Sequence, residues 1–271
     1  MDFVLIAISI VGGLALAFGL GLGYAARIFV VKIDPRVEKI NEMLPHANCG
    51  ACGYAGCEAF ANALVEDPSI IDSCTSSTQE SREAIAEVLG VKAGAISEVK
   101  AQLLCRGGAN SKDAYKYLGI ESCAAASLLM EGPKICKYGC LGFGDCVEAC
   151  PFGAISMLQE GYPLIDTGKC TGCGICVETC PKSLFSLMDR YDPLIACASQ
   201  DKGAAVSKYC TVGCIACKRC VKACEPEAIS MENNLAVIDY EKCIQCYKCV
   251  EVCPKNTIVR VGQKVEVRVE S

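Results

Sequence analysis

Residues 170–181 read CTGCGICVETCP, and this stretch decides the fold. Its four cysteines follow the spacing C-x2-C-x2-C-x3-C, with proline next, without deviation. Thiolates at this spacing bind iron–sulfur clusters, because the first three can hold three corners of one cubane while the fourth points away to a neighbouring cluster. The motif therefore predicts clusters in pairs, and each pair needs a second cysteine run.

The second run is present, and the whole pair is repeated. Residues 136–151 read CKYGCLGFGDCVEACP, and two later runs occupy residues 210–226 (CTVGCIACKRCVKACEP) and 243–254 (CIQCYKCVEVCP). The first of these runs aligns without a gap to the one that starts 74 residues later. One position departs, because Phe143 stands where the repeat has Cys217. The internal repeat predicts two similar modules, each able to hold two clusters.

An earlier cysteine block has the spacing C-x2-C-x4-C-x16-C. The run after its third cysteine predicts a short helix that ends near Pro68, and Ser77 with Glu80 resembles the capping box of a second helix that ends at Gly90. Structural zinc usually takes its cysteines as two pairs, whereas three of these converge in one glycine-rich loop, which favours a cubane. The four cysteines are Cys49, Cys52, Cys57 and Cys74.

The sequence assigns 20 of its 24 cysteines to five [4Fe-4S] clusters. Because Phe143 removes one thiolate from the first module, Cys136 is the simplest replacement. The five predicted sets are Cys49, Cys52, Cys57 and Cys74; Cys136, Cys140, Cys146 and Cys180; Cys150, Cys170, Cys173 and Cys176; Cys214, Cys217, Cys220 and Cys253; and Cys224, Cys243, Cys246 and Cys249. The remaining four could hold a sixth cluster or could simply be small buried residues: Cys105, Cys123, Cys197 and Cys210.

The composition excludes several other kinds of protein. The 271-residue chain has one histidine, so histidine-based catalysis has a single candidate, His46, which we interpret as a local hydrogen-bonding residue. The net charge of −5 does not favour nucleic-acid binding, which requires a basic surface. The chain contains no GxGxxG or P-loop motif. Disulfides and structural zinc remain the alternatives to clusters.

The N-terminus predicts a membrane anchor. Residues 3–26 carry no charge, and 24 residues are enough to cross a bilayer core of about 30 Å. A cleavable signal peptide is the alternative, but Asp2 stands where basic residues would be expected. Basic residues follow the apolar run, which predicts a single-pass protein of the cytoplasmic (inner) membrane with its cysteine-rich part on the cytoplasmic side. That compartment is reducing and disfavours twelve disulfides.

Short strands complete an α+β fold. Residues 154–158 and 163–166 flank a turn at Glu160, and residues 228–231 and 235–239 flank a turn at Asn233. The last segment, residues 257–270, alternates between apolar and polar residues, which predicts an edge strand or a hairpin. Each module is predicted as a two-cluster α+β unit built around its metal. The predicted divisions are a membrane anchor (1–32), a four-cysteine [4Fe-4S] domain (33–100), a connecting segment (101–134), a first module (135–190), a linker (191–208), a second module (209–263) and a tail (264–271).

The order of one apolar span, the four-cysteine block and two tandem ferredoxin-type modules resembles the B-subunit family of the Rnf complexes. The resemblance covers nearly the whole chain. It implies a membrane-bound ferredoxin–NAD oxidoreductase that couples electron flow to sodium or proton translocation, in which this chain takes electrons from reduced soluble ferredoxin. It also implies partners among the other membrane and peripheral subunits, and no self-contained substrate site on this chain.

Residues alone support an electron relay, and two alternatives stay open. One is a component of a different membrane oxidoreductase, and the other is a non-redox protein stabilised by zinc or disulfides. Soluble ferredoxins are typically acidic, so basic residues in the second module are candidate docking residues, an ordinary solvated face being the alternative. They are Lys218, Arg219 and Lys222.

Overall fold

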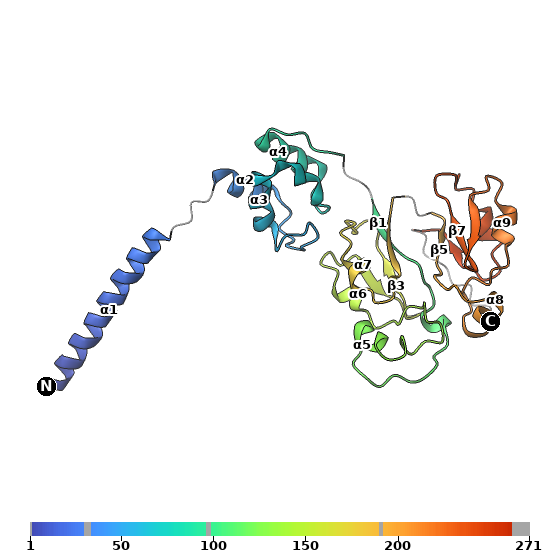
Figure 1. Ribbon diagram of the computed structural model, residues 1–271, viewed down its shortest axis with the longest axis horizontal. Helices are drawn as coiled ribbons and strands as arrows, with labels where there is room; N and C mark the ends of the chain where they lie inside the picture. The colour runs from blue at the N-terminus through green and yellow to red at the C-terminus, as the bar shows by residue number, and fades with distance from the viewer. Residues whose placement is uncertain (1, 30–33, 96–98, 190–191, 262–271) are drawn as a thin grey trace.

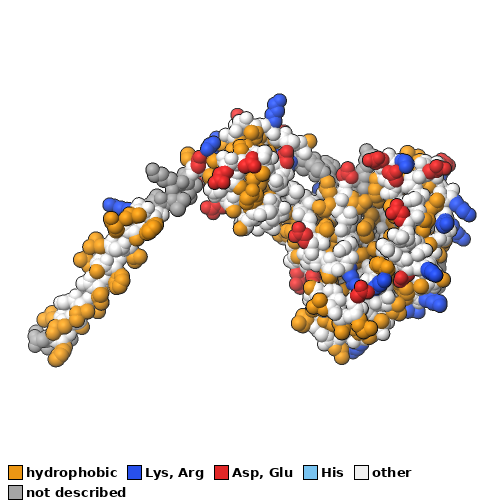
Figure 2. All heavy atoms as spheres, in the orientation of Figure 1, with side chains coloured by type: hydrophobic (Ala, Val, Ile, Leu, Met, Phe, Trp, Pro, Cys, Tyr) orange, Lys and Arg blue, Asp and Glu red, His pale blue; other side chains and the backbone are white. Residues whose placement is uncertain are grey.

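The computed structural model describes residues 2–29, 34–95, 99–189 and 192–261. Its first element is α1 (Asp2–Ile28), drawn as one uninterrupted helix in Figure 1. The stretch Leu5–Ile28 has a mean hydropathy of 2.4, and none of its most apolar window is buried. Figure 2 shows hydrophobic side chains along the helix. By length and composition α1 can cross a membrane, and no other helix in the described ranges can.

A small helical unit follows. Its core joins Ile40, Phe60, Leu64 and Ile85, all at most 2% exposed, so three helices share one apolar centre. The elements are α2 (Pro35–Met43), α3 (Cys57–Glu66), the short 3-10 helix η1 (Pro68–Ser73) and α4 (Gln79–Leu89).

The predicted helices are present, with one shift at a cap. Thr78, rather than Ser77, caps α4, since its Oγ1 accepts a hydrogen bond from the Ser81 amide at 3.2 Å. Ser77 is buried and donates to the Cys74 carbonyl at 2.9 Å. Gly90 ends the helix in the left-handed region at φ 71°, as predicted.

The two modules share a plan of two antiparallel strand pairs and two short helices. In the first module the pairs are β1 (Lys100–Leu103) with β4 (Phe185–Met188) and β2 (Ile155–Met157) with β3 (Pro163–Ile165), beside α6 (Asp145–Glu148) and α7 (Ile175–Thr179). In the second they are β5 (Leu194–Ile195) with β8 (Ile258–Val259) and β6 (Ile229–Glu232) with β7 (Leu235–Ile238), beside α9 (Arg219–Ala223) and α10 (Lys248–Glu251).

Each module has a thin aliphatic core. Leu184 and Phe185 anchor the first, and Ile229 and Ile258 anchor the second. Cysteines supply much of the remaining buried area in both. So little aliphatic burial in units of this size indicates that bound metal contributes to stability.

Residues 101–134, which the sequence predicts as a connecting segment, also contribute secondary structure to the first module. Their first residues form β1, and the rest runs through η2 (Gly108–Asn110) and α5 (Cys123–Ser127) along the base of the first module (Figure 1). Backbone bonds also tie this segment to the second module, because the Lys112 amide donates to the carbonyl of Tyr209 at 2.8 Å. Tyr209 ends α8 (Gly203–Tyr209).

The last segment is partly described. Its start forms β8, which pairs with β5, as an edge-type strand was predicted to do. The rest of the predicted strand, residues 262–271, lies outside the described residues.

Candidate iron–sulfur centres

The N-terminal thiols surround one pocket. Cys49, Cys52, Cys57 and Cys74 all line it, together with the loop that carries the first three. Gly50 and Gly53 adopt φ values of 73° and 87°, which lets the loop wrap tightly. The Asn48 side chain accepts a hydrogen bond from the Cys57 amide at 2.8 Å, which fixes the loop to the start of α3. The structure thus brings together the set predicted from C-x2-C-x4-C-x16-C.

A buried arginine holds the backbone at the fourth cysteine of this set. Arg82 is 4% exposed, and its Nη2 donates to the Cys74 carbonyl at 2.8 Å. Its Nη1 lies 3.4 Å from a carboxylate oxygen of Asp72. Burial raises the pKa of the Cys74 thiol. Hydrogen bonds from the Ser76 and Ser77 amides act in the opposite direction and favour the thiolate.

The second set differs from the sequence prediction. Cys140, Cys146 and Cys180 line one pocket as expected, but the fourth thiol there belongs to Cys123. Cys136 lies elsewhere. Burial is the main cause that raises the pKa of Cys146 to about 11, and the nearby Cys123 and Cys180 thiols add to it. Motif spacing could not reveal Cys123, because it begins α5, which lies outside the repeat.

Asp145 is what places Cys123 beside the first module. Its carboxylate accepts hydrogen bonds from the amides of Cys123 at 2.7 Å and Ala124 at 3.0 Å, and from the Ser122 hydroxyl at 2.9 Å. Burial favours the protonated carboxyl, yet these bonds outweigh it and lower the pKa of Asp145. The carboxylate therefore anchors the N-terminus of α5 and its thiol.

The thiols of the third predicted set lie together in the first module. Cys150, Cys170, Cys173 and Cys176 line a single pocket between α7 and the strands. The amide of Ala101 donates to Cys170 Sγ at 3.5 Å, and Lys100 Nζ donates to the Cys170 carbonyl at 2.7 Å. Strand β1 thus contributes directly to this site. Amide bonds to ligand sulfurs of this kind tune cluster potentials.

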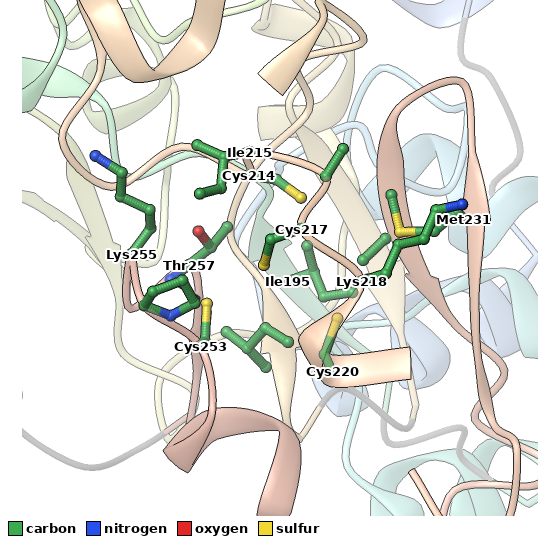
Figure 3. Close-up of a pocket in the computed structure, with 14 residues that line it drawn as sticks. Ile195, Cys214, Ile215, Cys217, Lys218, Cys220, Met231, Cys253, Lys255 and Thr257 are labelled. Atoms are coloured by element: carbon green, nitrogen blue, oxygen red, sulfur yellow. Dashed lines mark hydrogen bonds between the residues drawn. The ribbon is translucent and has the colours of Figure 1, made fainter. Parts of the chain in front are cut away.

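The fourth set lies in the second module. Figure 3 shows the side chains of Cys214, Cys217, Cys220 and Cys253 directed into one pocket from different segments. The Thr257 amide donates to Cys253 Sγ at 3.3 Å. Cys214 and Cys217 come from the loop before α9, Cys220 lies in α9, and Cys253 belongs to the last cysteine motif.

The fifth predicted set lies around α10. Burial raises the pKa of Cys249 to about 11, and the nearby thiols of Cys243 and Cys246 add to the effect. Cys224 and Cys243 pack against the same core cluster as Cys249. Cys217 and Cys246 are the two exposed cysteines of the chain.

The four remaining cysteines form a further group. Cys105, Cys136, Cys197 and Cys210 line one pocket between the two modules. The sequence had placed Cys123 in this group and Cys136 in the second set. The structure exchanges the two, because the Asp145-anchored loop takes Cys123 to the second set.

The chemistry of the donors fits clusters better than the alternatives. All 24 cysteines are free thiols. Within the described ranges, no three Cys, His, Asp or Glu side chains converge closely enough to hold a single metal ion. A zinc site needs its sulfurs about 2.3 Å from one ion, whereas four thiolates around a cubane must stand further apart. Four-thiol pockets without a single-ion arrangement therefore match iron–sulfur ligation.

These features define a class: an iron–sulfur protein with two ferredoxin-type dicluster modules, a separate four-cysteine unit and an apolar N-terminal helix. Comparison with protein families agrees. Residues 44–76 match the family described as "Putative Fe-S cluster", and residues 135–184 and 213–257 match the 4Fe-4S dicluster domain.

The particular family follows from full-length relatives. The chain is 40% identical over 261 residues, 95% of its length and 99% of the relative's, to the B subunit of the ion-translocating oxidoreductase complex of Methanosarcina acetivorans. It is 42% identical to the B subunit of the proton-translocating ferredoxin:NAD(+) oxidoreductase complex of Clostridium ljungdahlii, covering 87% and 83% of the two chains. It is 43% identical to the Na(+)-translocating counterpart of Acetobacterium woodii, covering 95% and 78%. The chain belongs to the B-subunit family of these Rnf-type complexes.

Proposed function

We propose that this chain is the electron-carrying component of an Rnf-type complex and that five of its thiol sets hold [4Fe-4S] clusters. The supporting observation is that four of these sets each line a separate pocket with four thiols, of which only Cys123 lies outside the cysteine motifs. Bound clusters supply one-electron transfer, with potentials set by burial and hydrogen bonds to sulfur. In the second set Cys123 takes the place predicted for Cys136.

The relatives' names indicate the partners. Two of them are named as members of ferredoxin:NAD(+) oxidoreductase complexes that translocate protons or sodium ions. For this chain we propose reduced soluble ferredoxin as the electron donor and the other subunits of the complex as acceptors. Electron flow to NAD then drives movement of Na+ or H+. The chain itself needs only to hold, insulate and orient the carriers.

The membrane arrangement follows from α1. Its 24-residue apolar stretch suits a single span, and Arg27 lies in its last turn. Basic residues after a span favour the cytoplasmic side. We propose a single-pass anchor in the cytoplasmic membrane with the cysteine-rich units in the cytoplasm, where soluble ferredoxin is available.

The second module offers a surface for an acidic donor. Lys218, Arg219 and Lys222 are exposed around the start of α9, next to the exposed thiol of Cys217. Figure 2 shows Lys and Arg side chains along the edge of the molecule formed by this module. A basic surface beside the most exposed thiols would attract an acidic protein and shorten the distance for electron entry.

Anaerobic purification of the native complex tests the proposal. The partners should include the other membrane subunits, and visible absorption from the clusters should bleach with dithionite. Five clusters correspond to about 20 iron atoms per chain. A colourless chain with bound zinc, or a stable chain without metal, would contradict the proposed function.

A further inference from the structure

Four thiols outside the five sets meet between the two modules, two from each. Cys105 follows β1 in the first module, and Cys197 follows β5 in the second. Cys136 and Cys210 occupy the same position of the internal repeat, 74 residues apart. All four line one pocket. Each module therefore contributes two thiols from corresponding positions. Incidental packing of small residues would not be expected to repeat in this way.

The hydrogen bonds at this pocket repeat the same symmetry. The Cys140 amide donates to Cys105 Sγ at 3.4 Å, and the Cys214 amide donates to Cys197 Sγ at 3.4 Å. Cys140 and Cys214 are themselves repeat equivalents that belong to the second and fourth sets. Amide bonds to sulfur stabilise thiolates. Each module thus directs one backbone amide at the sulfur of one of these thiols.

Glycines leave room around three of the thiols. A Cβ added to Gly107 would lie 3.3 Å from Cys105 Sγ, and one added to Gly213 would lie 3.3 Å from Cys210 Sγ and 2.5 Å from Val206. Gly139, the repeat equivalent of Gly213, would carry its Cβ 3.7 Å from Cys136 Sγ. Side chains at 107 and 213 would crowd the neighbouring thiols, whereas a Cβ at 139 would make an ordinary contact with Cys136 Sγ.

A polar atom beside the thiols has no partner. Ser111 is 4% exposed and lines the pocket, and its hydroxyl makes no hydrogen bond in the described structure. A buried hydroxyl without a partner destabilises the folded protein. A sulfide or thiolate in the pocket would accept the missing bond. The hydroxyl therefore points to an anionic, sulfur-rich occupant.

Buried free thiols are the alternative explanation. Burial raises the pKa of the Cys105 and Cys197 thiols, as it does for any buried thiol. Neutral small thiols account for burial, but they do not account for the two equivalent amide–sulfur bonds or for the unpaired Ser111 hydroxyl. A single zinc ion is disfavoured because no three of the described thiols converge on one point.

We infer that Cys105, Cys136, Cys197 and Cys210 hold a sixth [4Fe-4S] cluster, shared by the two modules. The inference extends the proposed function, since it adds a carrier to the same relay. The site lies between the second and fourth sets, to which the amides of Cys140 and Cys214 connect it. The sixth cluster would lie between the pair of clusters in the first module and the pair in the second, and would connect the two pairs for electron transfer.

Iron content of crossed double variants tests the inference. The full chain in its anaerobically purified complex should contain about 24 iron atoms rather than about 20. Cys123→Ala with Cys140→Ala alters one site and should remove about four. Cys136→Ala with Cys140→Ala alters two sites and should remove about eight, and Cys136→Ala with Cys197→Ala should again remove about four.

The opposite pattern would overturn the sixth site while leaving the proposed function intact. In that case the unaltered chain contains about 20 iron atoms, Cys136→Ala with Cys140→Ala removes only about four, and Cys197→Ala removes none. Absence of iron from the unaltered chain would instead overturn the proposed function itself. The two failures are therefore distinguishable.

A conservative variant guards against misfolding. Ser111→Ala should keep all the iron, because the hydroxyl is no ligand. It should shift the midpoint potential of one cluster to a more negative value in an EPR-monitored titration, because a hydrogen bond to sulfur stabilises the reduced state. Identical titrations for the unaltered chain and Ser111→Ala would argue against a cluster beside Ser111.

Discussion

The two ferredoxin-type modules repeat one sequence plan but obtain one thiol in different ways. In the second module the loop before α9 supplies Cys217 to its pocket. In the first module Phe143 stands at that position, its ring against that of Tyr117, and Cys123 enters from α5 instead. The comparison shows that a pocket constrains where a sulfur atom must be, not which segment brings it. Because Cys123 is the fourth thiol of the second set, Cys136 is available to line the pocket between the modules.

The largest expected effect comes from undoing this exchange. Cys123→Ala should remove about four iron atoms per chain, because the second set would keep only three thiols. Phe143→Cys in the same chain should restore them. Iron and acid-labile sulfide per chain, measured after anaerobic purification, check both expectations.

The backbone makes the restoration feasible. Gly142 and Gly144 flank Phe143 with φ values of 83° and 90°, and the repeat equivalents Ala216 and Lys218 also have positive φ, at 53° and 59°. A cysteine at 143 would thus start from the same loop shape as Cys217. The matched control is Cys217→Ala, which should lose about four iron atoms without any second thiol to replace it. No iron loss in Cys123→Ala would return Cys136 to the second set.

Charge is the next difference between the modules. Asp145 and Glu148 occupy the repeat positions of Arg219 and Lys222, so the helix that is acidic in the first module is basic in the second. Reversing Lys218, Arg219 and Lys222 to glutamate should slow electron uptake from reduced soluble ferredoxin about tenfold at low salt, because steering by opposite charge is lost. Stopped-flow reduction at two ionic strengths measures this.

The control for this experiment lies at the equivalent helix. Glu148 is exposed in α6, and Glu148→Lys should leave uptake unchanged if the donor docks only on the second module. The difference between the unaltered chain and the reversed variant should shrink at high salt, since screening weakens the attraction for both. A loss that does not depend on salt would argue against docking at Lys218, Arg219 and Lys222.

A smaller effect is expected from the anchor of the substitute thiol. Asp145→Ala removes the acceptor for two amides and the Ser122 hydroxyl. Losing such a helix-capping arrangement costs about 1–2 kcal/mol, which corresponds to about tenfold faster opening of the Cys123 loop. Iron release to a chelator should accelerate for one cluster only. Asp145→Asn retains one acceptor and should have a weaker effect, and equal release rates for both variants and the unaltered chain would contradict the anchoring role.

Much of this arrangement could be predicted from spacing and repeat. The hairpins, the helix after Cys57 and four of the thiol groupings follow from sequence patterns, because each ferredoxin motif places three thiols at one site and its fourth at the neighbouring site. The exchange of Cys123 and Cys136 could not be predicted. It depends on a carboxylate, Asp145, that captures a loop more than 20 residues away in sequence, and no motif encodes that contact. The register of β1 with β4 could not be predicted either, because it pairs residues that are far apart in the chain.

The smallest expected difference lies in the turns of the two hairpins. The turn between β2 and β3 contains Gly161 at φ 71°, and the turn between β6 and β7 contains Asn234 at φ 66°. Both residues are in the left-handed region. Gly161→Ala should destabilise the first module by about 1 kcal/mol, because alanine disfavours the left-handed region. The nearest atom to its new Cβ is the Ala109 nitrogen at 3.6 Å, so no clash adds to this cost. The temperature at which half of the cluster absorption is lost should fall by a few degrees.

Asn234→Gly is the matched change in the second module. Glycine adopts the left-handed region more easily, but the change removes the hydrogen bond from Asn234 Nδ2 to the Gln200 carbonyl at 3.1 Å. The two effects oppose each other, so the same temperature should hardly move. If Gly161→Ala also left it unchanged, the first hairpin would have to be held by its packing on residues 108–109, and the turn itself would contribute little to the stability of that module.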